Sequence, residues 1–255
     1  MTSLEFYKKL TERIPKELSC SWDGDGFEVC ADKDREVGRV LVSLDITNEV
    51  IDKAIDENFD VIVAHHPLFF KGIKEVSVLS PDGERAVKLV KNNISVMTFH
   101  TRLDAVEGGV NDTLASCLGL LDVETLEYNG ENMIRVGNLE NEMKPEDFAA
   151  LVKERLGAPA ITLSLGGKNV KRIALLGGSG GGDIGACRVC LADTYVTGEM
   201  RYHELLSSGD RGVNLIEAGH FYTEYPVCEI LKKFIGEIDP SIAVEVYFSD
   251  RVKVI

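Results

Sequence analysis

The five histidines of this 255-residue chain lie at or soon after the ends of short apolar runs that are typical of buried strands. Open parallel sheets bind their ligands outside the carboxyl ends of the strands, so this is where a site is expected. A single histidine in such a place is more often a loop residue than a ligand, but the grouping of all five favours a metal site. They are His65, His66, His100, His203 and His220.

Two adjacent histidines carry the strongest part of this pattern. His65 and His66 leave an apolar run together, and Pro67 favours extended backbone at His66. Adjacent extended residues point to opposite sides of the chain, so the two imidazoles do not easily ligate one ion. Their arrangement suits two neighbouring ions.

Carboxylates at helical spacing supply further ligands. Asp104 lies four residues after His100, and Glu224 lies four residues after His220. Residues four apart share one face of a helix. Three imidazoles and two carboxylates are too many for one tetrahedral zinc ion and suit two ions about 3.5–4 Å apart, bridged by a carboxylate and water. Zn, Mn, Fe, Co and Ni are all compatible with this set, which consists of His65, His66, Asp104, His220 and Glu224.

The first half of the chain predicts a parallel sheet covered by helices on both faces. Thr2-Ser3-Leu4-Glu5 forms a capping box at the start of an amphipathic helix. Continuous apolar runs then alternate with helical segments, which is the pattern of buried parallel strands. We expect strands at 40–44, 61–64 and 94–99, and helices at about 48–57 and 85–91.

The second half begins with a hairpin and then resumes the alternation. Strand-like runs between about 123 and 139 flank the favourable turn Asn129-Gly130, and Pro145 opens a helix at its first turn. We therefore expect an α/β fold with mainly parallel sheets and a hairpin-containing connector. Its two lobes, about 1–120 and 121–255, form a single unit over 1–255. Strands of the second lobe are expected at 173–176, 194–196, 213–216 and 244–248.

The composition restricts the classes of function. Asp and Glu number 42 against 28 Lys and Arg, a formal net charge of −14. Non-specific coating of nucleic acid needs a basic excess and is not expected, whereas one nucleotide ligand needs only local positive charge. The N-terminus lacks a secretory signal, and no apolar run approaches the ~18–20 residues of a membrane span. With six scattered cysteines, we expect a reduced, cytoplasmic protein that binds no membrane.

Four separated motifs follow one another along the chain in the same order as in a known family, and such agreement does not arise by coincidence. They lie at 63–70, which contains His-His-Pro, and at 100–112, 197–203 and 218–224. Together they resemble the GTP cyclohydrolase 1 type 2 homologue family, also called Nif-three-like proteins. The resemblance extends from the opening helix through Trp22-Asp23 to the C-terminus.

This resemblance implies two intertwined α/β lobes that enclose a two-metal site, in a ring-shaped homohexamer whose central cavity the sites face. At 255 residues the chain has no room for the large middle domain that some relatives carry. His100 and His203 match family positions near the metals, which implies a role in supporting the ligands or in proton transfer. The family's metal ligands correspond to the five that the chemistry selects: His65, His66, Asp104, His220 and Glu224.

One segment departs from the family pattern. Trp22-Asp23-Gly24-Asp25-Gly26 stands where the family usually has Trp-Asp-Asn before a glycine-leucine pair. We interpret the acidic residues Asp23, Asp25 and Glu28 as a solvated loop, so this departure leaves the metal ligands unaffected.

The function implied by the resemblance is hydrolytic opening of the guanine imidazole ring of GTP with release of formate, or hydrolysis of a related nucleotide. A water acidified by two metals would attack an electrophilic carbon or phosphorus, with His203 or His100 moving the proton. The alternative is a non-catalytic metal-binding protein with a regulatory or interaction role, in which the ring is a platform. The sequence favours the enzyme, because His100 and His203 exceed what ligation needs.

Two further patterns are assigned structural roles. Residues 180–185 fit the dinucleotide-binding G-x-G-x-x-G, but Asp183 puts negative charge where a pyrophosphate would sit. A tight turn into a helix, or a flexible rim of the cavity, is favoured for this loop. Cys187 and Cys190 form a C-x-x-C without the second pair of a zinc ribbon, and we expect buried small apolar residues there.

Overall fold

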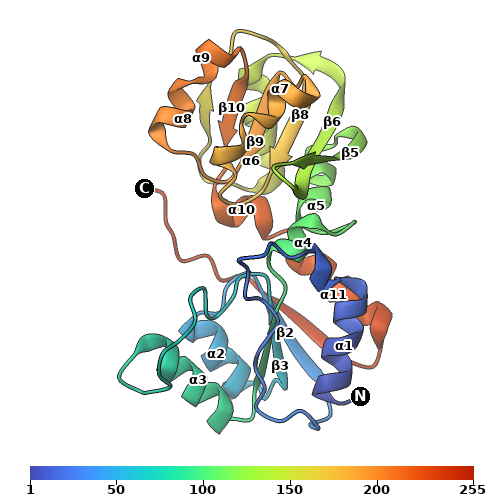
Figure 1. The fold of residues 1–255 in the computed structure, drawn as a ribbon, viewed down its shortest axis with the longest axis vertical. Coiled ribbons are helices and arrows are strands. Elements are labelled where there is room, and N and C mark those ends of the chain that lie inside the picture. The colour runs from blue at the N-terminus through green and yellow to red at the C-terminus, as the bar shows by residue number, and fades with distance from the viewer. The chain divides into compact units, whose positions relative to one another are not determined.

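The computed structural model describes residues 1–255, which form two compact units. Unit 1 comprises residues 1–103 and 228–251, and unit 2 comprises residues 104–227 and 252–255. The chain leaves unit 1 inside helix α4 (Thr101–Ala105) and returns at the start of helix α11 (Val227–Ile238). Each unit contains one β-sheet with helices packed against it (Figure 1), which confirms the predicted α/β fold.

The sheet of unit 1 has five strands in the order β1-β4-β3-β2-β11. Adjacent strands of this sheet are parallel, except that the edge strand β1 is antiparallel to β4. The three predicted strands and the helix at 48–57 are correct to within one residue, whereas the helix predicted at 85–91 already begins at Pro81. The elements are α1 (Ser3–Arg13), η1 (Lys16–Leu18), β1 (Phe27–Val29), β2 (Arg39–Ser43), α2 (Asn48–Asp56), β3 (Val61–Ala64), α3 (Pro81–Lys91), β4 (Ser95–Thr98), α11 and β11 (Ala243–Tyr247).

Helices cover both faces of this sheet. Figure 1 shows α2 and α3 on one side of β2 and β3, and α1 and α11 on the other. Every residue of β3 is buried, as expected for a parallel strand covered twice. On one face Ile62 belongs to the same apolar cluster as Val50 of α2 and Leu89 of α3. The predicted capping box of α1 is present, with reciprocal hydrogen bonds between Thr2 and Glu5.

The sheet of unit 2 has six strands in the order β5-β6-β8-β9-β10-β7. Its centre, β8-β9-β10, is parallel, while β5, β6 and β7 are paired antiparallel. The elements are α5 (Val110–Leu118), β5 (Leu121–Tyr128), β6 (Glu131–Met143), α6 (Pro145–Leu156), β7 (Thr162–Ser164), β8 (Val170–Leu176), η2 (Gly181–Asp183), α7 (Ala186–Cys190), β9 (Thr194–Thr197), α8 (Tyr202–Leu206), α9 (Ser208–Arg211), β10 (Asn214–Glu217) and α10 (His220–Glu224).

The predicted hairpin is present, but it is part of a sheet and not a connector. Asn129 and Gly130 both have positive φ, 54° and 82°, as the two central positions of a type I′ turn require. Strand β6 pairs with β8 as well as with β5, so the hairpin extends the sheet of unit 2. A two-residue turn imposes antiparallel pairing. The second sheet is therefore mixed, whereas the first is mainly parallel.

The last strand follows unit 2 in the sequence but belongs to the sheet of unit 1. β11 pairs in parallel with β2, from Ala243 opposite Arg39 to Tyr247 opposite Ser43. The sequence placed this run with the second lobe, because its apolar pattern does not specify which sheet it joins.

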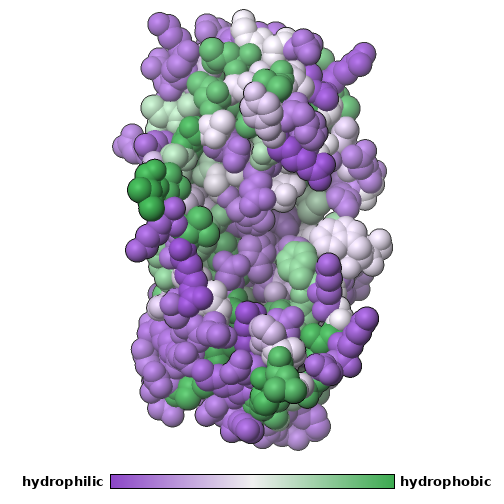
Figure 2. All heavy atoms as spheres, turned by 90° about the vertical axis from the view of Figure 1, so that its left-hand side faces the viewer, coloured by the Kyte–Doolittle hydropathy of each residue, from purple (hydrophilic) through white to green (hydrophobic).

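One face of the molecule is predominantly hydrophilic, with apolar side chains in small separate groups (Figure 2). This surface agrees with a composition in which 42 acidic residues outnumber 28 basic ones. None of the helices is both long enough and apolar enough to pass through a bilayer.

Candidate metal-binding residues

Three histidines of unit 1 gather at the carboxyl ends of β3 and β4. His65 and His66 follow β3 directly, and His100 lies two residues after β4. Each of the three imidazoles contributes one ring nitrogen to a group in which all three nitrogens lie within 4.8 Å of one another. The ring centroids of His65 and His66 are 4.9 Å apart, and those of His65 and His100 are 5.3 Å apart. The structure thus brings these three together, as their positions after the strands predicted.

Oxygen atoms orient the two adjacent imidazoles through Nδ1. Nδ1 of His65 lies 2.9 Å from the carbonyl oxygen of Phe99. Nδ1 of His66 lies 2.8 Å from Oδ1 of Asp45, the residue with which the β2 run ends. An acceptor at Nδ1 favours the tautomer protonated there, and the lone pair is then on Nε2. Metal-binding histidines are commonly held in this way, so both rings fit a ligand role.

Asp23 holds His100 and the first turn of α4. Its Oδ2 lies 3.1 Å from Nδ1 of His100 and accepts hydrogen bonds from the backbone N–H and the hydroxyl of Thr101, at 2.9 and 2.6 Å. Burial by itself raises the pKa of Asp23, but the hydrogen bonds from His100 and Thr101 outweigh it and hold the pKa well below its ordinary 3.8. Asp23 is therefore ionised at neutral pH and orients the imidazole of His100.

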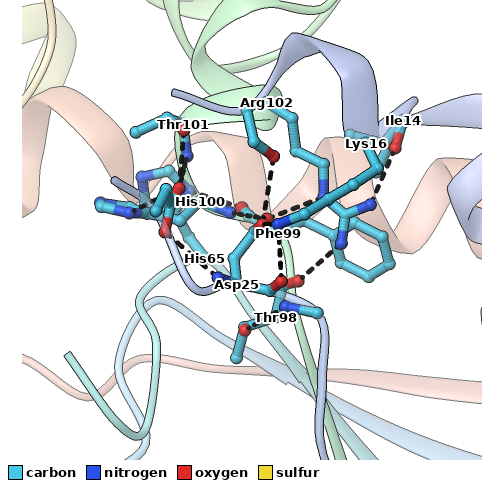
Figure 3. A network of polar contacts seen from close by, with 12 residues as sticks. Ile14, Lys16, Asp25, His65, Thr98, Phe99, His100, Thr101 and Arg102 are labelled. Atoms are coloured by element: carbon cyan, nitrogen blue, oxygen red, sulfur yellow. Dashed lines mark hydrogen bonds and ion pairs between the residues drawn. The ribbon is translucent and has the colours of Figure 1, made fainter. Parts of the chain in front are cut away.

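Asp25 is buried and joins distant parts of unit 1 (Figure 3). Its Oδ2 accepts from Nε of Arg102 at 2.7 Å and from the backbone N–H of His100 at 2.9 Å. Lys16 forms an ion pair with the other carboxylate oxygen. Arg102 is also fully buried and donates to two backbone carbonyls at 3.2 Å. A buried ion pair whose groups are all hydrogen-bonded fixes the local geometry, here that of the segment carrying His100.

These contacts show that the interpretation of Asp23, Asp25 and Glu28 as a solvated loop is wrong. The side chains of Asp23 and Asp25 are almost completely buried. Glu28 accepts hydrogen bonds from the backbone N–H groups of Leu68 and Phe69, at 2.7 and 3.2 Å. Except for Lys16, which is 9 residues from Asp25, these partners lie between 40 and 78 residues away in the sequence. A local sequence pattern does not reveal contacts at such separations. The interpretation therefore relied on composition alone, and acidic residues among glycines are typical of a surface loop.

Unit 2 carries the other predicted ligands. On α10, Nε2 of His220 lies 3.0 Å from Oε2 of Glu224, which confirms the predicted spacing of one helical turn. Nδ1 of His220 lies 3.0 Å from Oε1 of Glu199, so an oxygen orients this imidazole as well. Asp104 and Glu224 are buried, and an oxygen of each lies within 4.8 Å of the other. The chemistry of these donors suits divalent transition metals.

Glycines after β8 and β9 let α10 approach the ends of these strands. Gly178 has a φ of +61°, and a Cβ at this position would overlap the carboxylate of Glu224. Its N–H donates to Oγ1 of Thr223 at 3.0 Å. A Cβ on Gly198 would lie 2.7 Å from Cα of His220. Only glycine permits this proximity, which explains the glycines at these two strand ends.

The glycine-rich loop and the cysteine pair have the structural roles that the sequence favoured. The turn η2 (Gly181–Asp183) leads into the short helix α7. Cys187 is buried and Cys190 is partly buried, both in the apolar cluster beside the sheet of unit 2. Burial raises the pKa of both thiols above the ordinary 9.0, so both are neutral at physiological pH.

His203 lies on α8 with its side chain exposed, and it belongs to none of the groups of close ligand atoms. A role in proton transfer therefore stays a prediction for this residue.

Comparison with known proteins identifies the family. The profile of Duf34/NIF3 (NGG1p interacting factor 3) matches residues 1–253. The GTP cyclohydrolase 1 type 2 homolog of Clostridium perfringens is 32% identical over 220 residues, which cover 84% of this chain and 83% of that protein. The protein of the same name from Lactococcus lactis is 32% identical over 255 residues, covering 97% and 95%. The crystal structure of a Staphylococcus aureus hypothetical protein has a TM-score of 0.91 at 28% identity, covering 100% of this chain and 99% of that one. The chain therefore belongs to the Duf34/NIF3 family, as its four motifs predicted.

Proposed function

We propose that the chain is a metal-dependent hydrolase with a centre of two divalent transition-metal ions. The observation that carries this proposal is the common arrangement of three imidazoles, in which Nδ1 of each ring faces an oxygen atom, so that the lone pair a metal needs is on Nε2. This arrangement is typical of histidines that bind metals. The proposed ligands are His65, His66, Asp104, His220 and Glu224.

The chain's own residues orient the ligands and move the proton. When bound, two such ions lower the pKa of a water molecule towards neutrality and so supply a nucleophile. Asp45 orients His66, and Glu199 orients His220. His100, whose Nδ1 faces the ionised Asp23, accepts and returns a proton at Nε2. His203 is a second candidate for this transfer.

The proposed substrate is a nucleotide, and the candidate reaction is hydrolytic opening of the guanine imidazole ring of GTP. Two water molecules cleave the two bonds from carbon 8 to nitrogen, and carbon 8 leaves as formate. The names of the curated relatives support this reaction class. Formate is the product that identifies ring opening, whereas inorganic phosphate identifies hydrolysis of a phosphate bond in a related reaction.

Product release from GTP by the metal-loaded protein tests this function. We expect formate or phosphate from the wild type and only background release from Glu224→Gln, because an amide is a weaker ligand than a carboxylate. The matched control is Glu229→Gln, an exposed carboxylate in the next helix, which should retain full turnover. Equal turnover by both variants contradicts the proposed site. Two bound ions without turnover of any nucleotide would favour the alternative, a non-catalytic metal-binding regulatory or interaction protein.

The proposed assembly is a ring-shaped homohexamer located in the cytoplasm, as the family resemblance implies. Light scattering in solution should give about six times the chain mass of 28.0 kDa, because the assembly is a closed ring of identical subunits. The mass of a single chain would contradict the ring, and recovery in a membrane fraction would contradict the location.

A further inference from the structure

Two exposed aromatic rings border the histidine cluster of unit 1. Trp22 is 63% exposed and Phe70 is 67% exposed. Both contact the imidazole of His100, with ring centroids at 5.9 and 5.3 Å and interplanar angles of 75° and 69°. Neither ring is stacked face to face with His100, so each keeps aromatic surface open to solvent.

Buried or partly buried carboxylates hold both aromatic residues in place. Trp22 immediately precedes Asp23, whose carboxylate accepts two hydrogen bonds from Thr101. Phe70 immediately follows Phe69, whose N–H, like that of Leu68, donates to Glu28. Burying a carboxylate is costly unless it is well paired, so these anchors are specific features of the fold. They present Trp22 and Phe70 on fixed segments, and ordering such segments on binding costs little entropy.

We propose that Trp22 and Phe70 form a stacking subsite for the planar base of the substrate, beside His100. This inference rests on the proposed function, because it names the part of a nucleotide that this surface recognises. Bases of every type stack on aromatic side chains, since each presents a π-face. The rings offer apolar aromatic faces beside His100, a surface that suits a planar base. The subsite therefore orients the base of the nucleotide.

Fluorescence of Trp22 gives a direct test, because it is the only tryptophan of the chain. Guanosine 5′-monophosphate and ribose 5-phosphate are titrated separately into the zinc-loaded and the chelator-treated full-length protein. We expect saturable quenching by the nucleotide and none by the sugar phosphate, which has no base. Equal quenching by both, or none by the nucleotide, overturns the subsite.

Variants of Phe70 keep the fluorescent residue and test the second ring. Phe70→Leu should weaken binding of the nucleotide by about fivefold or more, the range of aromatic stacking with a base. Phe70→Tyr retains the ring and should bind within about twofold of the wild type. Leu79→Ala, at a position 91% exposed in the same stretch of chain, is the matched control and should have no effect.

The outcomes separate this inference from the proposed function. Base-dependent quenching that is sensitive to Phe70→Leu supports the subsite even if no nucleotide is hydrolysed. Hydrolysis of GTP with an unchanged KM in Phe70→Leu overturns the subsite and leaves the hydrolase intact. An equal loss of nucleotide binding in Phe70→Leu and Phe70→Tyr also overturns the subsite, because the aromatic ring, which Phe70→Tyr retains, would then not be the group that binds the base.

Discussion

At the scale of single residues, the candidate site depends on oxygen atoms that orient imidazoles. Nδ1 of each proposed histidine ligand lies within 3.0 Å of such an oxygen, and Nδ1 of His100 is 3.1 Å from Asp23. The sequence placed all five histidines at or soon after strand ends, and four of them lie in groups of close ligand atoms, whereas His203 does not. The sequence did not reveal the orienting oxygens of Phe99, Asp23 and Glu199, since their pairing depends on how strands distant in the sequence are arranged.

Asp23→Asn tests the orientation of His100 and its pH dependence. The pKa of Asp23 in the folded chain lies below its value in the unfolded chain, so its contribution to stability is present above about pH 3.8 and is lost as pH falls through the folded-state pKa. Near pH 7 we expect the variant to lose about 2 kcal/mol in urea unfolding, the size of a hydrogen bond to a charged group. Below pH 3.8 the two proteins should converge in stability.

The control for this prediction is Asp210→Asn, because Asp210 is exposed and the change should be almost neutral at every pH. If Asp23→Asn lost the same stability at pH 7 and at pH 2, the ionised carboxylate would not be the stabilising species.

At the scale of elements, the approach of α10 to β8 positions His220 and Glu224. Gly178→Ala introduces a side chain where φ is +61° and where Cβ would overlap Glu224. We expect the metal-free protein to lose more than about 1 kcal/mol in unfolding free energy, from the left-handed backbone alone. We also expect weaker zinc binding, because the Glu224 carboxylate must move. Gly182→Ala is the matched control, since nothing lies within 4 Å of its added Cβ; equal losses in both variants would contradict this account.

Most elements could be predicted because their signals are local. The capping box of α1, the Asn129-Gly130 turn and the proline at the start of α6 each specify a boundary through nearby residues. The sheet to which β6 and β11 belong could not be predicted in this way. An apolar run specifies that a strand is buried, whereas its neighbours follow from the packing of the complete chain.

At the scale of the whole molecule, the sheet of unit 1 is built from two separate parts of the chain. The C-terminal strand β11 completes the sheet of unit 1 by pairing with β2, about two hundred residues earlier. Unit 1 therefore cannot complete its sheet until nearly the whole chain is available, and the histidine cluster at the ends of β3 and β4 belongs to that sheet. The proposed ligands His65 and His66 thus follow a strand of a sheet that is completed only by this long-range pairing.

The metal content of the protein tests the central claim most directly. Elemental analysis of protein purified without chelator should find about two transition-metal ions per chain, and clearly fewer in His220→Ala, because that variant lacks one imidazole ligand. Lys233→Ala, an exposed charged residue of α11, should retain the wild-type content. Absence of metal from the wild type and from His220→Ala alike, even after reconstitution with zinc, manganese or iron, would contradict the account and would mean that the histidine cluster is purely structural.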